Sequence, residues 1–243
     1  FKEGEELRAG AVLNSTNQKE FVLFITKKGF LKKSKLSNYN LKVKRGSKAI
    51  NLDENDEIVS VDFVNDEDYG ILTNNGLLSI ITTKDVNPIG RIARGVIGIR
   101  LKGDDFVSAG HIIPKETKSI LTVTADGFAS RSLIEEYNIT ARGAKGLKVQ
   151  KEKNTVDFLT ITDNSDIMIT SNAAKIVVKL KEFSITHRGA VGVKSIKLKD
   201  NEHIIRLAKI WWIESLKQSE LFGIIYIQGW ERNRPWKYIK YIK

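Results

Sequence analysis

The chain has 243 residues, of which 41% are hydrophobic and 28% charged, a composition typical of a folded protein. Its 40 lysine and arginine residues outnumber 29 aspartate and glutamate residues, which gives a net charge of +11. This charge favours a polyanion such as nucleic acid, or an anionic membrane surface, as the partner. The alternative is a basic surface that binds nothing. The chain has no cysteine, which excludes disulfides and thiolate metal sites, and it has no apolar run of the roughly 20 residues that a membrane-spanning helix needs.

The first residues read as the end of a repeating unit. Residues 3–13 align without a gap with Glu54 to Val64, so we expect residues 1–13 to be the closing segment of a repeat whose front half is absent. The chain also opens at Phe1 without a methionine, which suggests a piece of a longer protein.

A short apolar strand that ends in a turn occurs four times, at residues 21–29, 70–76, 120–127 and 167–174. The turn pairs Asn75-Gly76 and Asp126-Gly127 predict two-residue type I′ hairpins, which need positive φ at both central positions. The fourth copy ends in Ala174 instead of glycine. Each turn is followed by a second short strand.

An Arg-Gly phrase follows each hairpin and has nearly the same spacing throughout. Its arginines are Arg45, Arg94, Arg142 and Arg188, separated by 49, 48 and 46 residues. The last three copies read Arg-Gly-x-x-Gly, and each phrase leads into a short apolar run at Ile50, Ile99, Leu147 or Val193. Such a period is the mark of a repeat architecture.

A polar turn and an apolar strand close each unit, as in Asn55 to Val61 and Asp104 to Ala109. Four short antiparallel strands in about 48 residues are what one propeller blade needs, and we find no sustained helical period. The sequence therefore predicts an all-β disc over residues 1–210. Its four full repeats cover about residues 19–67, 68–117, 118–165 and 166–210.

Residues 211–243 differ from the rest because they hold all four tryptophans. The segment 221–230 could be a degenerate hairpin that joins residues 1–13 in a composite blade and closes a ring of five. The alternative is a packing extension without blade geometry, whose aromatic side chains pack or stack on single-stranded bases.

Cationic side chains recur in two places of the repeat, the strand after the hairpin turn and the Arg-Gly loop. We expect Lys32, Arg131 and Lys179 to share one outer rim, where they and their neighbours neutralise phosphates. The full set of candidate DNA-binding residues is Lys32, Lys33, Lys35, Lys44, Arg45, Lys48, Arg91, Arg94, Arg100, Arg131, Arg142, Lys145, Lys148, Lys179, Lys181, Arg188 and Lys194.

Each of these residues also has a structural interpretation. Lysines on edge strands discourage edge-to-edge pairing, and the arginines could brace their loops by bonding carbonyl groups. The glycines of the phrase favour positive φ or a close backbone approach over ligand binding. The phrase is not a nucleotide loop, because it lies between strands and opens no helix.

The repeat resembles the C-terminal domain of the gyrase A protein of DNA gyrase and that of its topoisomerase IV counterpart. The matching pieces are Thr26 to Lys33, the Arg-Gly-x-x-Gly loops, and the closing strands Asp56 to Ser60 and Asp105 to Ser108. The resemblance implies a β-pinwheel, a propeller-like disc in which neighbouring blades exchange an outer strand.

The resemblance also implies a function, namely bending or wrapping of double-stranded DNA around a basic rim without a catalytic group or cofactor in this domain. Its partners would be the catalytic core of the same polypeptide and the ATPase component of the topoisomerase, in the cytoplasm, and the isolated domain would be monomeric. The box resembling Gln-Arg-Arg-Gly-Gly-Lys-Gly that marks the gyrase type has only a degenerate counterpart at Ala141 to Gly146. The box could lie upstream of Phe1 or be missing, and if it is missing, bending of the topoisomerase IV kind is favoured over full wrapping.

Two other classes of function compete with this one. A protein-interaction propeller would bind no duplex, and a propeller enzyme would need converging catalytic groups. His111, His187 and His203 lie far apart and read as ordinary surface or turn residues, and Asp104 with Asp105 reads as a solvated turn.

Overall fold

The computed structural model describes residues 5–12, 18–39, 47–210, 224–230 and 238–242. These residues form short strands and four single-turn 3-10 helices, as the repeat predicts. The strands are β1 (Glu5–Val12), β2 (Phe21–Thr26), β3 (Phe30–Lys35), β4 (Ser47–Lys48), β5 (Ile58–Val64), β6 (Asp68–Thr73), β7 (Leu77–Thr82), β8 (Val96–Ile97), β9 (Val107–Ile113), β10 (Ser119–Thr124), β11 (Phe128–Leu133), β12 (Leu147–Lys148), β13 (Thr155–Ile161), β14 (Asp166–Ser171), β15 (Lys175–Val178), β16 (Val193–Lys194), β17 (Ile204–Ile210), β18 (Ile224–Trp230) and β19 (Tyr238–Ile242). The helices are η1 (Leu36–Asn38), η2 (Thr83–Asp85), η3 (Ile134–Glu136) and η4 (Leu180–Glu182).

Three-residue turns, not the predicted type I′ turns, connect the first two strands of the repeats. In the turn between β6 and β7, the N–H of Gly76 donates to the carbonyl of Thr73, and the Thr73 hydroxyl accepts from the N–H of Leu77. Gly76 has φ 75°, whereas Asn75 and Asp126 are not among the residues with positive φ. The type I′ prediction was therefore wrong: only the glycine takes the left-handed conformation, as in a hairpin that ends in a bulge.

The blades of the first three repeats receive their outermost strand from the next repeat. The third strand of a repeat leaves its own sheet and pairs with the second strand of the preceding one: β8 pairs with β3, β12 with β7 and β16 with β11. The sheet orders are β5-β2-β3-β8, β9-β6-β7-β12 and β13-β10-β11-β16, and the remaining sheet, β17-β14-β15, has three strands. The exchanged outer strand of a β-pinwheel is thus confirmed.

The two ends of the chain form a fifth sheet, in the order β1-β18-β19-β4. β1 pairs with β18 from Glu5 opposite Trp230 to Val12 opposite Ile224, and β19 pairs with β4, which comes from the first repeat. Strands from the two ends of the chain thus share one sheet in the backbone. Most of the aromatic tail lies outside the described residues, including Trp211, Trp212 and Trp236.

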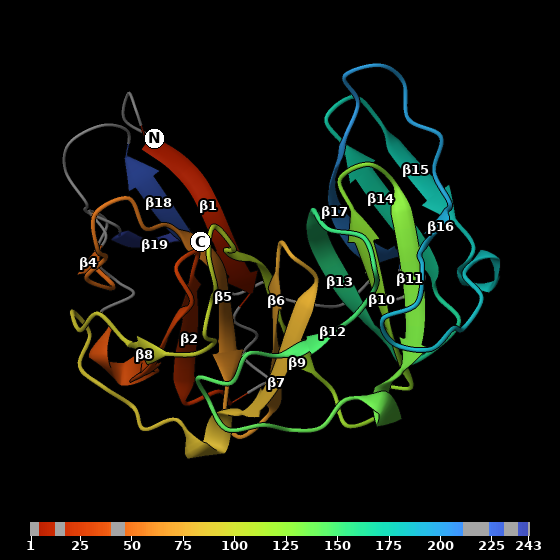
Figure 1. The fold of residues 1–243 in the computed structure, drawn as a ribbon. Coiled ribbons are helices and arrows are strands. Elements are labelled where there is room, and N and C mark those ends of the chain that lie inside the picture. The colour runs from red at the N-terminus through yellow and green to blue at the C-terminus, as the bar shows by residue number, and fades with distance from the viewer. Residues whose placement is uncertain (1–4, 13–17, 40–46, 211–223, 231–237, 243) are drawn as a thin grey trace.

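The five sheets follow one another around an arc, with β1 and β17 at its two ends (Figure 1). The innermost strands β1, β5, β9, β13 and β17 contact one another in that order. β2 and β10 lie in the middle of their sheets and are buried on both faces, which explains why β2 reads as a continuous apolar run rather than an alternating one.

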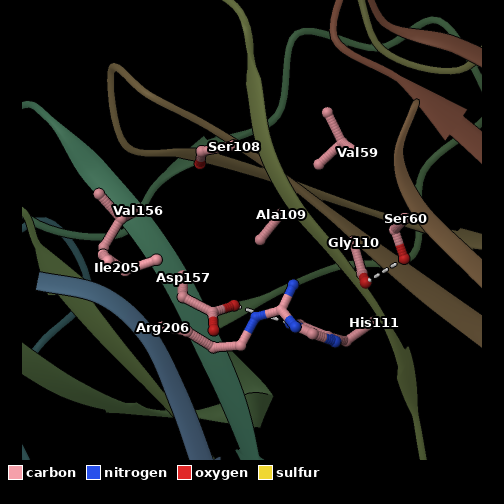
Figure 2. A pocket seen from close by; sticks show the side chains of 10 residues that line it. All are labelled: Val59, Ser60, Ser108, Ala109, Gly110, His111, Val156, Asp157, Ile205 and Arg206. Carbon is pink, nitrogen blue, oxygen red and sulfur yellow. Dashed lines mark hydrogen bonds and ion pairs between the residues drawn. The ribbon is translucent and has the colours of Figure 1, made fainter. Parts of the chain in front are cut away.

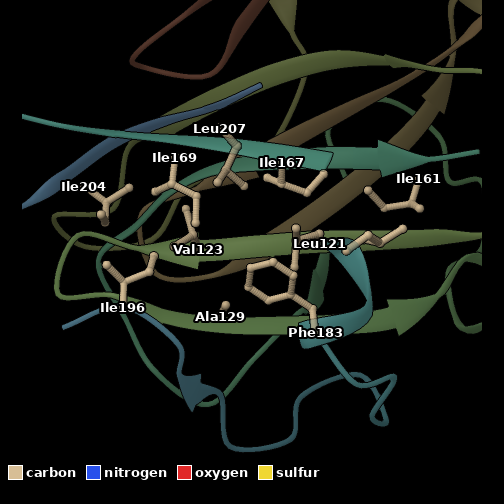
Figure 3. Close-up of a cluster of buried hydrophobic side chains, with 11 residues drawn as sticks. Leu121, Val123, Ala129, Ile161, Ile167, Ile169, Phe183, Ile196, Ile204 and Leu207 are labelled. Carbon is tan, nitrogen blue, oxygen red and sulfur yellow. The ribbon is translucent and has the colours of Figure 1, made fainter. Parts of the chain in front are cut away.

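Hydrophobic clusters between neighbouring sheets hold the arc together. Figure 3 shows the cluster between the third and fourth repeats, where Leu121 and Val123 of β10 meet Ile167 and Ile169 of β14. The sheets of the second and third repeats each bury one face against the preceding repeat and the other against the next. Burial of both faces requires neighbours, as expected for a repeat protein.

No helix among the described residues is long and apolar enough to cross a membrane.

Candidate nucleic-acid interface

The Arg-Gly loops of successive repeats bond to one another. The backbone N–H of Gly143 donates to Gly98 at 2.7 Å, and that of Arg100 donates to Ala144 at 3.0 Å. The same contact recurs one repeat later, where Gly189 donates to Val149 at 2.8 Å. We call the described loop residues 47–51, 88–100, 139–151 and 185–195 the Arg-Gly rim. The loops therefore form a continuous strip along the outer edges of the blades.

The glycines of the phrase are required by backbone geometry. Gly95 has φ 112°, and a Cβ atom at this position would lie 2.8 Å from the carbonyl oxygen of Leu31 in the neighbouring strand. Gly146 has φ 79° and would place a Cβ atom 3.0 Å from the backbone of Leu78. Both glycines let the loop lie against the outer edge of the preceding blade.

Three cations of the rim extend into solvent. Arg100, Arg142 and Lys145 are exposed, and no contact with a described residue holds their charged groups. Arg100 lies beside Ala144, next to Lys145, because its N–H donates to that carbonyl. Positive charges from two successive repeats therefore lie close together on adjacent blades.

The remaining exposed candidates belong to the first, second and fourth repeats. Lys35 ends β3, while Lys179 and Lys181 follow β15, and all three are exposed, with no partner for their ammonium groups in the described structure. Lys194 is exposed with its ammonium 5.7 Å from the ring centre of Phe128. Arg94 is exposed, but it forms a 2.9 Å ion pair with Asp53.

Four partly buried candidates brace the loops. Arg188 donates to the carbonyl oxygens of Glu136 and Lys148, each at 3.1 Å. Arg91 donates to the carbonyl of Lys48, Lys148 to that of Asn75, and Arg131 to Ser119 and Phe183. Apart from the Arg131–Ser119 bond, which lies within the third repeat, these bonds cross between repeats and fix the shape of the rim, so the structural interpretation applies to these four residues.

Lys32 and Lys33 do not lie on the rim, which corrects the expectation that they face a partner. Lys32 is fully buried, and its ammonium donates to the Tyr39 hydroxyl and to the carbonyls of Ala49 and Arg91. Burial, with the nearby charge of Arg91, lowers the pKa of Lys32 to about 7.

Lys33 is also buried and donates to the carbonyls of Asn65 and Thr83. Successive side chains of a strand point to opposite faces of the sheet, so all of them are buried when both faces are covered. The spacing of the lysines in the sequence does not reveal this burial. Of the three residues expected on one rim, Lys179 is exposed, Arg131 is partly buried and Lys32 is buried.

Two candidates, Lys44 and Arg45, lie outside the described residues. Lys48 is partly buried, and its ammonium donates to the Asn51 side chain at 3.0 Å.

A polar network at the centre of the arc was missed by the sequence analysis. His111 of β9 bonds Asp157 of β13 at 2.7 Å, and the other oxygen of Asp157 accepts the N–H of Leu207 on β17 at 2.9 Å. Figure 2 shows these side chains around a small cavity of about 60 Å³. His111 is therefore not an ordinary surface or turn residue, because it joins two blades.

Asp62 extends this network to the first repeat. The Tyr69 hydroxyl donates to Asp62 at 2.6 Å, and the Ser60 hydroxyl donates to the carbonyl of Gly110 at 2.8 Å. Burial raises the pKa of Asp62, although Tyr69 and His111 act against that change. The network contains residues from five strands, β5, β6, β9, β13 and β17, and only folding brings these strands together.

The carboxylates of the closing turns have structural partners. The Asp105 side chain accepts the N–H groups of Asn75 and Phe106, each at 2.9 Å, and therefore ties the hairpin turn to the closing strand. Asp56 does the same in the first repeat. No cluster of three or more His, Cys, Asp or Glu side chains suited to a metal ion occurs in the described parts of the chain.

The chain matches the model of the family described as DNA gyrase C-terminal domain, beta-propeller, four times, at residues 20–65, 71–114, 118–164 and 166–210. The DNA gyrase A protein of Staphylococcus epidermidis is 33% identical over 207 residues, which are 82% of this chain and 23% of that protein. The corresponding protein of Staphylococcus aureus is 32% identical over the same share. The chain thus spans about a quarter of the length of these relatives.

Two solved structures share the fold. A DNA gyrase A C-terminal domain superposes with a TM-score of 0.73 at 22% identity, covering 83% of this chain and 70% of the other. The C-terminal domain of a DNA topoisomerase IV superposes with a TM-score of 0.74 at 23% identity, covering 82% and 64%.

Proposed function

We propose, from the premise that this chain belongs to the family of DNA gyrase C-terminal domains, that it binds duplex DNA along the Arg-Gly rim and bends it around the arc. The observation that carries this proposal is the strip of mutually bonded loops, from which the side chains of Arg100, Arg142 and Lys145 extend without a partner among the described residues. Positive charges on a convex edge attract phosphates and release counterions on binding. Contacts to phosphates position a duplex without reading its bases, so sequence preference is expected to be weak.

The rim is suited to bending because its shape is fixed before DNA arrives. Arg91, Arg131, Lys148 and Arg188 hold neighbouring loops together through carbonyl bonds. Bending a site of 20–30 base pairs costs on the order of 1–10 kcal/mol. A rigid curved surface offsets this cost through additional phosphate contacts along the bent path.

Within a larger protein, we propose that the chain is a non-catalytic part of a type II topoisomerase. It would present bent DNA to the catalytic core of the same polypeptide, which works with the ATPase component in the cytoplasm. In this role it needs neither a cofactor nor a catalytic residue, and the isolated chain would be monomeric. The 23% share of the gyrase A relatives that it covers supports a role as one part of such a protein.

A length series tests the proposal. Duplexes of about 20 to 100 base pairs, labelled at both ends, are titrated with the full chain and read by gel shift and by energy transfer between the ends. We expect affinity to rise with length until the rim is filled, and energy transfer to increase on binding. The absence of binding at every length would refute the proposal, and binding without a change in energy transfer would refute bending.

A further inference from the structure

Exposed aliphatic side chains concentrate on the Arg-Gly rim. The described residues include ten large hydrophobic side chains that are exposed, and six of them belong to the rim. The six are Ile92, Ile97, Ile139, Ile185, Val191 and Val193. Single exposed aliphatic residues scattered over a surface are ordinary, but a concentration on the strip that also bears the free cations is not.

Ile139 and Ile185 occupy equivalent places in successive repeats. Each lies three residues before the arginine of its phrase, and the next residue anchors the backbone to the outer edge of a blade. The N–H of Thr140 donates to Ile80, and the N–H of Thr186 donates to Arg131, both at 2.7 Å. Ile139 is nevertheless 58% exposed and Ile185 50% exposed. The fold therefore holds two aliphatic side chains outward at fixed positions.

The partner that fits such a strip has anionic and apolar surfaces in alternation. A duplex backbone has this chemistry, because each phosphate is followed by a deoxyribose whose carbon atoms are apolar. We propose that Ile139 and Ile185 contact deoxyribose faces of the bound duplex, between the phosphates that the rim cations neutralise. This inference rests on the proposed function. It adds an apolar contribution to the free energy of DNA binding that does not depend on salt.

A protein partner fits the strip less well. Protein interfaces have a core of contiguous apolar surface that is depleted in charge. On the rim, Ile139 is followed within six residues by the exposed cations Arg142 and Lys145, and Val193 is followed directly by Lys194. The aliphatic side chains are thus interrupted by charges along the whole strip.

The test compares three variants of the full chain on one duplex of about 40 base pairs over a series of salt concentrations. The first is the double variant Ile139→Ser with Ile185→Ser. The second, Arg142→Gln with Lys145→Gln, removes charge from the same rim. The third, Ile205→Ser, is the matched control, because Ile205 is equally exposed at 50% but lies on β17 beside the central cavity, as Figure 2 shows.

We expect the isoleucine variant to bind roughly three- to tenfold more weakly at every salt concentration, as the loss of apolar contact predicts. Its slope of log affinity against log salt should equal that of the unchanged chain. The charge variant should lose about two units of slope, since each phosphate contact contributes about 0.9. Ile205→Ser should bind like the unchanged chain, and all variants should keep its melting temperature.

Three results would overturn the inference. Unchanged affinity of the isoleucine variant would mean that Ile139 and Ile185 face another partner, such as a protein. A reduced slope would mean that the substitution displaces the cations, and an equal loss in Ile205→Ser would make the effect nonspecific. If the unchanged chain bound no duplex, the proposed function itself would fail, and this inference with it.

Discussion

His111 and Asp157 join the second and third repeats through a 2.7 Å hydrogen bond at the centre of the arc. Asp157 also accepts the N–H of Leu207 from the fourth repeat, so one carboxylate connects three blades. Burial by itself would lower the pKa of His111, but the ion pair and hydrogen bond with Asp157, with Asp62 nearby, raise it despite the opposing charge of Arg206. This contact contributes to the alignment of the blades.

The pH dependence of stability follows from this contact. Because the folded pKa of His111 is raised, its stabilising contribution is complete below the unfolded value of about 6.5 and is lost as pH rises through the folded pKa. We expect the free energy of unfolding of the unchanged chain, relative to His111→Gln, to fall over that range. Urea unfolding at a series of pH values measures the difference, and parallel curves for the two proteins would contradict the assignment.

Asp157→Asn should destabilise the chain at neutral pH by about 1–3 kcal/mol, because it weakens the bond to His111 and disturbs the bond to Leu207. Asp163→Asn is a suitable control, since the hydrogen bonds that Asp163 accepts in the described structure come from its neighbours Thr162 and Ser165. Equal stability of the two variants in urea would argue against a role for the central network.

Gly95→Ala should destabilise the fold by about 1–3 kcal/mol, because an alanine there would take a left-handed φ and its Cβ would meet the Leu31 carbonyl. Gly90→Ala provides a control in the same loop, since no heavy atom lies within 4 Å of the added Cβ. Thermal unfolding of both variants measures the difference. A neutral Gly95→Ala would show that the loop is not held against β3 as described.

Gly103→Asn should be neutral or slightly stabilising, by up to about 0.5 kcal/mol. The closing turns of the other repeats place Asn55, Asn154 and Asn201 at φ values of 56°, 59° and 62°, and Gly103 has φ 62° with open space around it. Gly103→Val should destabilise, because a β-branched residue is strained in this conformation. The denaturant midpoints of both variants measure these changes in stability. A destabilised Gly103→Asn variant would contradict the equivalence of the four turns.

Lys32→Met should lower the free energy of unfolding by about 1–3 kcal/mol, since it leaves the Ala49 and Arg91 carbonyls without their buried donor. The salt slope of DNA binding should stay unchanged, because Lys32 lies inside the protein. Lys35→Met is the matched control and should leave stability within about 0.5 kcal/mol, since its side chain is exposed. A reduced salt slope in Lys32→Met would restore Lys32 as a phosphate contact.

The fold was predictable from the sequence because its signals are local and repeated. The Gly29, Gly76 and Gly127 turns, the Arg-Gly loops and the closing turns recur at one period, and each corresponds to one element of a blade. The register of the exchanged strand was harder to predict. The phrase leads directly into buried Ile50 and Ile99, but in later repeats the buried residues are Val149 and Ile196, while Val193 is 61% exposed.

The candidate site was only partly predictable, because exposure depends on tertiary contacts. Lys32 and Lys35 look alike in sequence, yet one is buried against two loops from different repeats and the other is exposed. The inward bonds of Arg188 and the pairing of His111 with Asp157 also join residues about 40 to 52 positions apart. A single sequence does not reveal such contacts.

The most direct test of the central claim is the salt dependence of duplex binding by the unchanged chain and by the triple variant Arg100→Gln, Arg142→Gln and Lys145→Gln. If the rim neutralises phosphates, the triple variant should lose about three units of slope in log affinity against log salt. Its melting temperature should be unchanged, because these side chains make no bonds within the described structure. A salt slope equal to that of the unchanged chain, or duplex binding by the unchanged chain that does not respond to salt, would contradict the account.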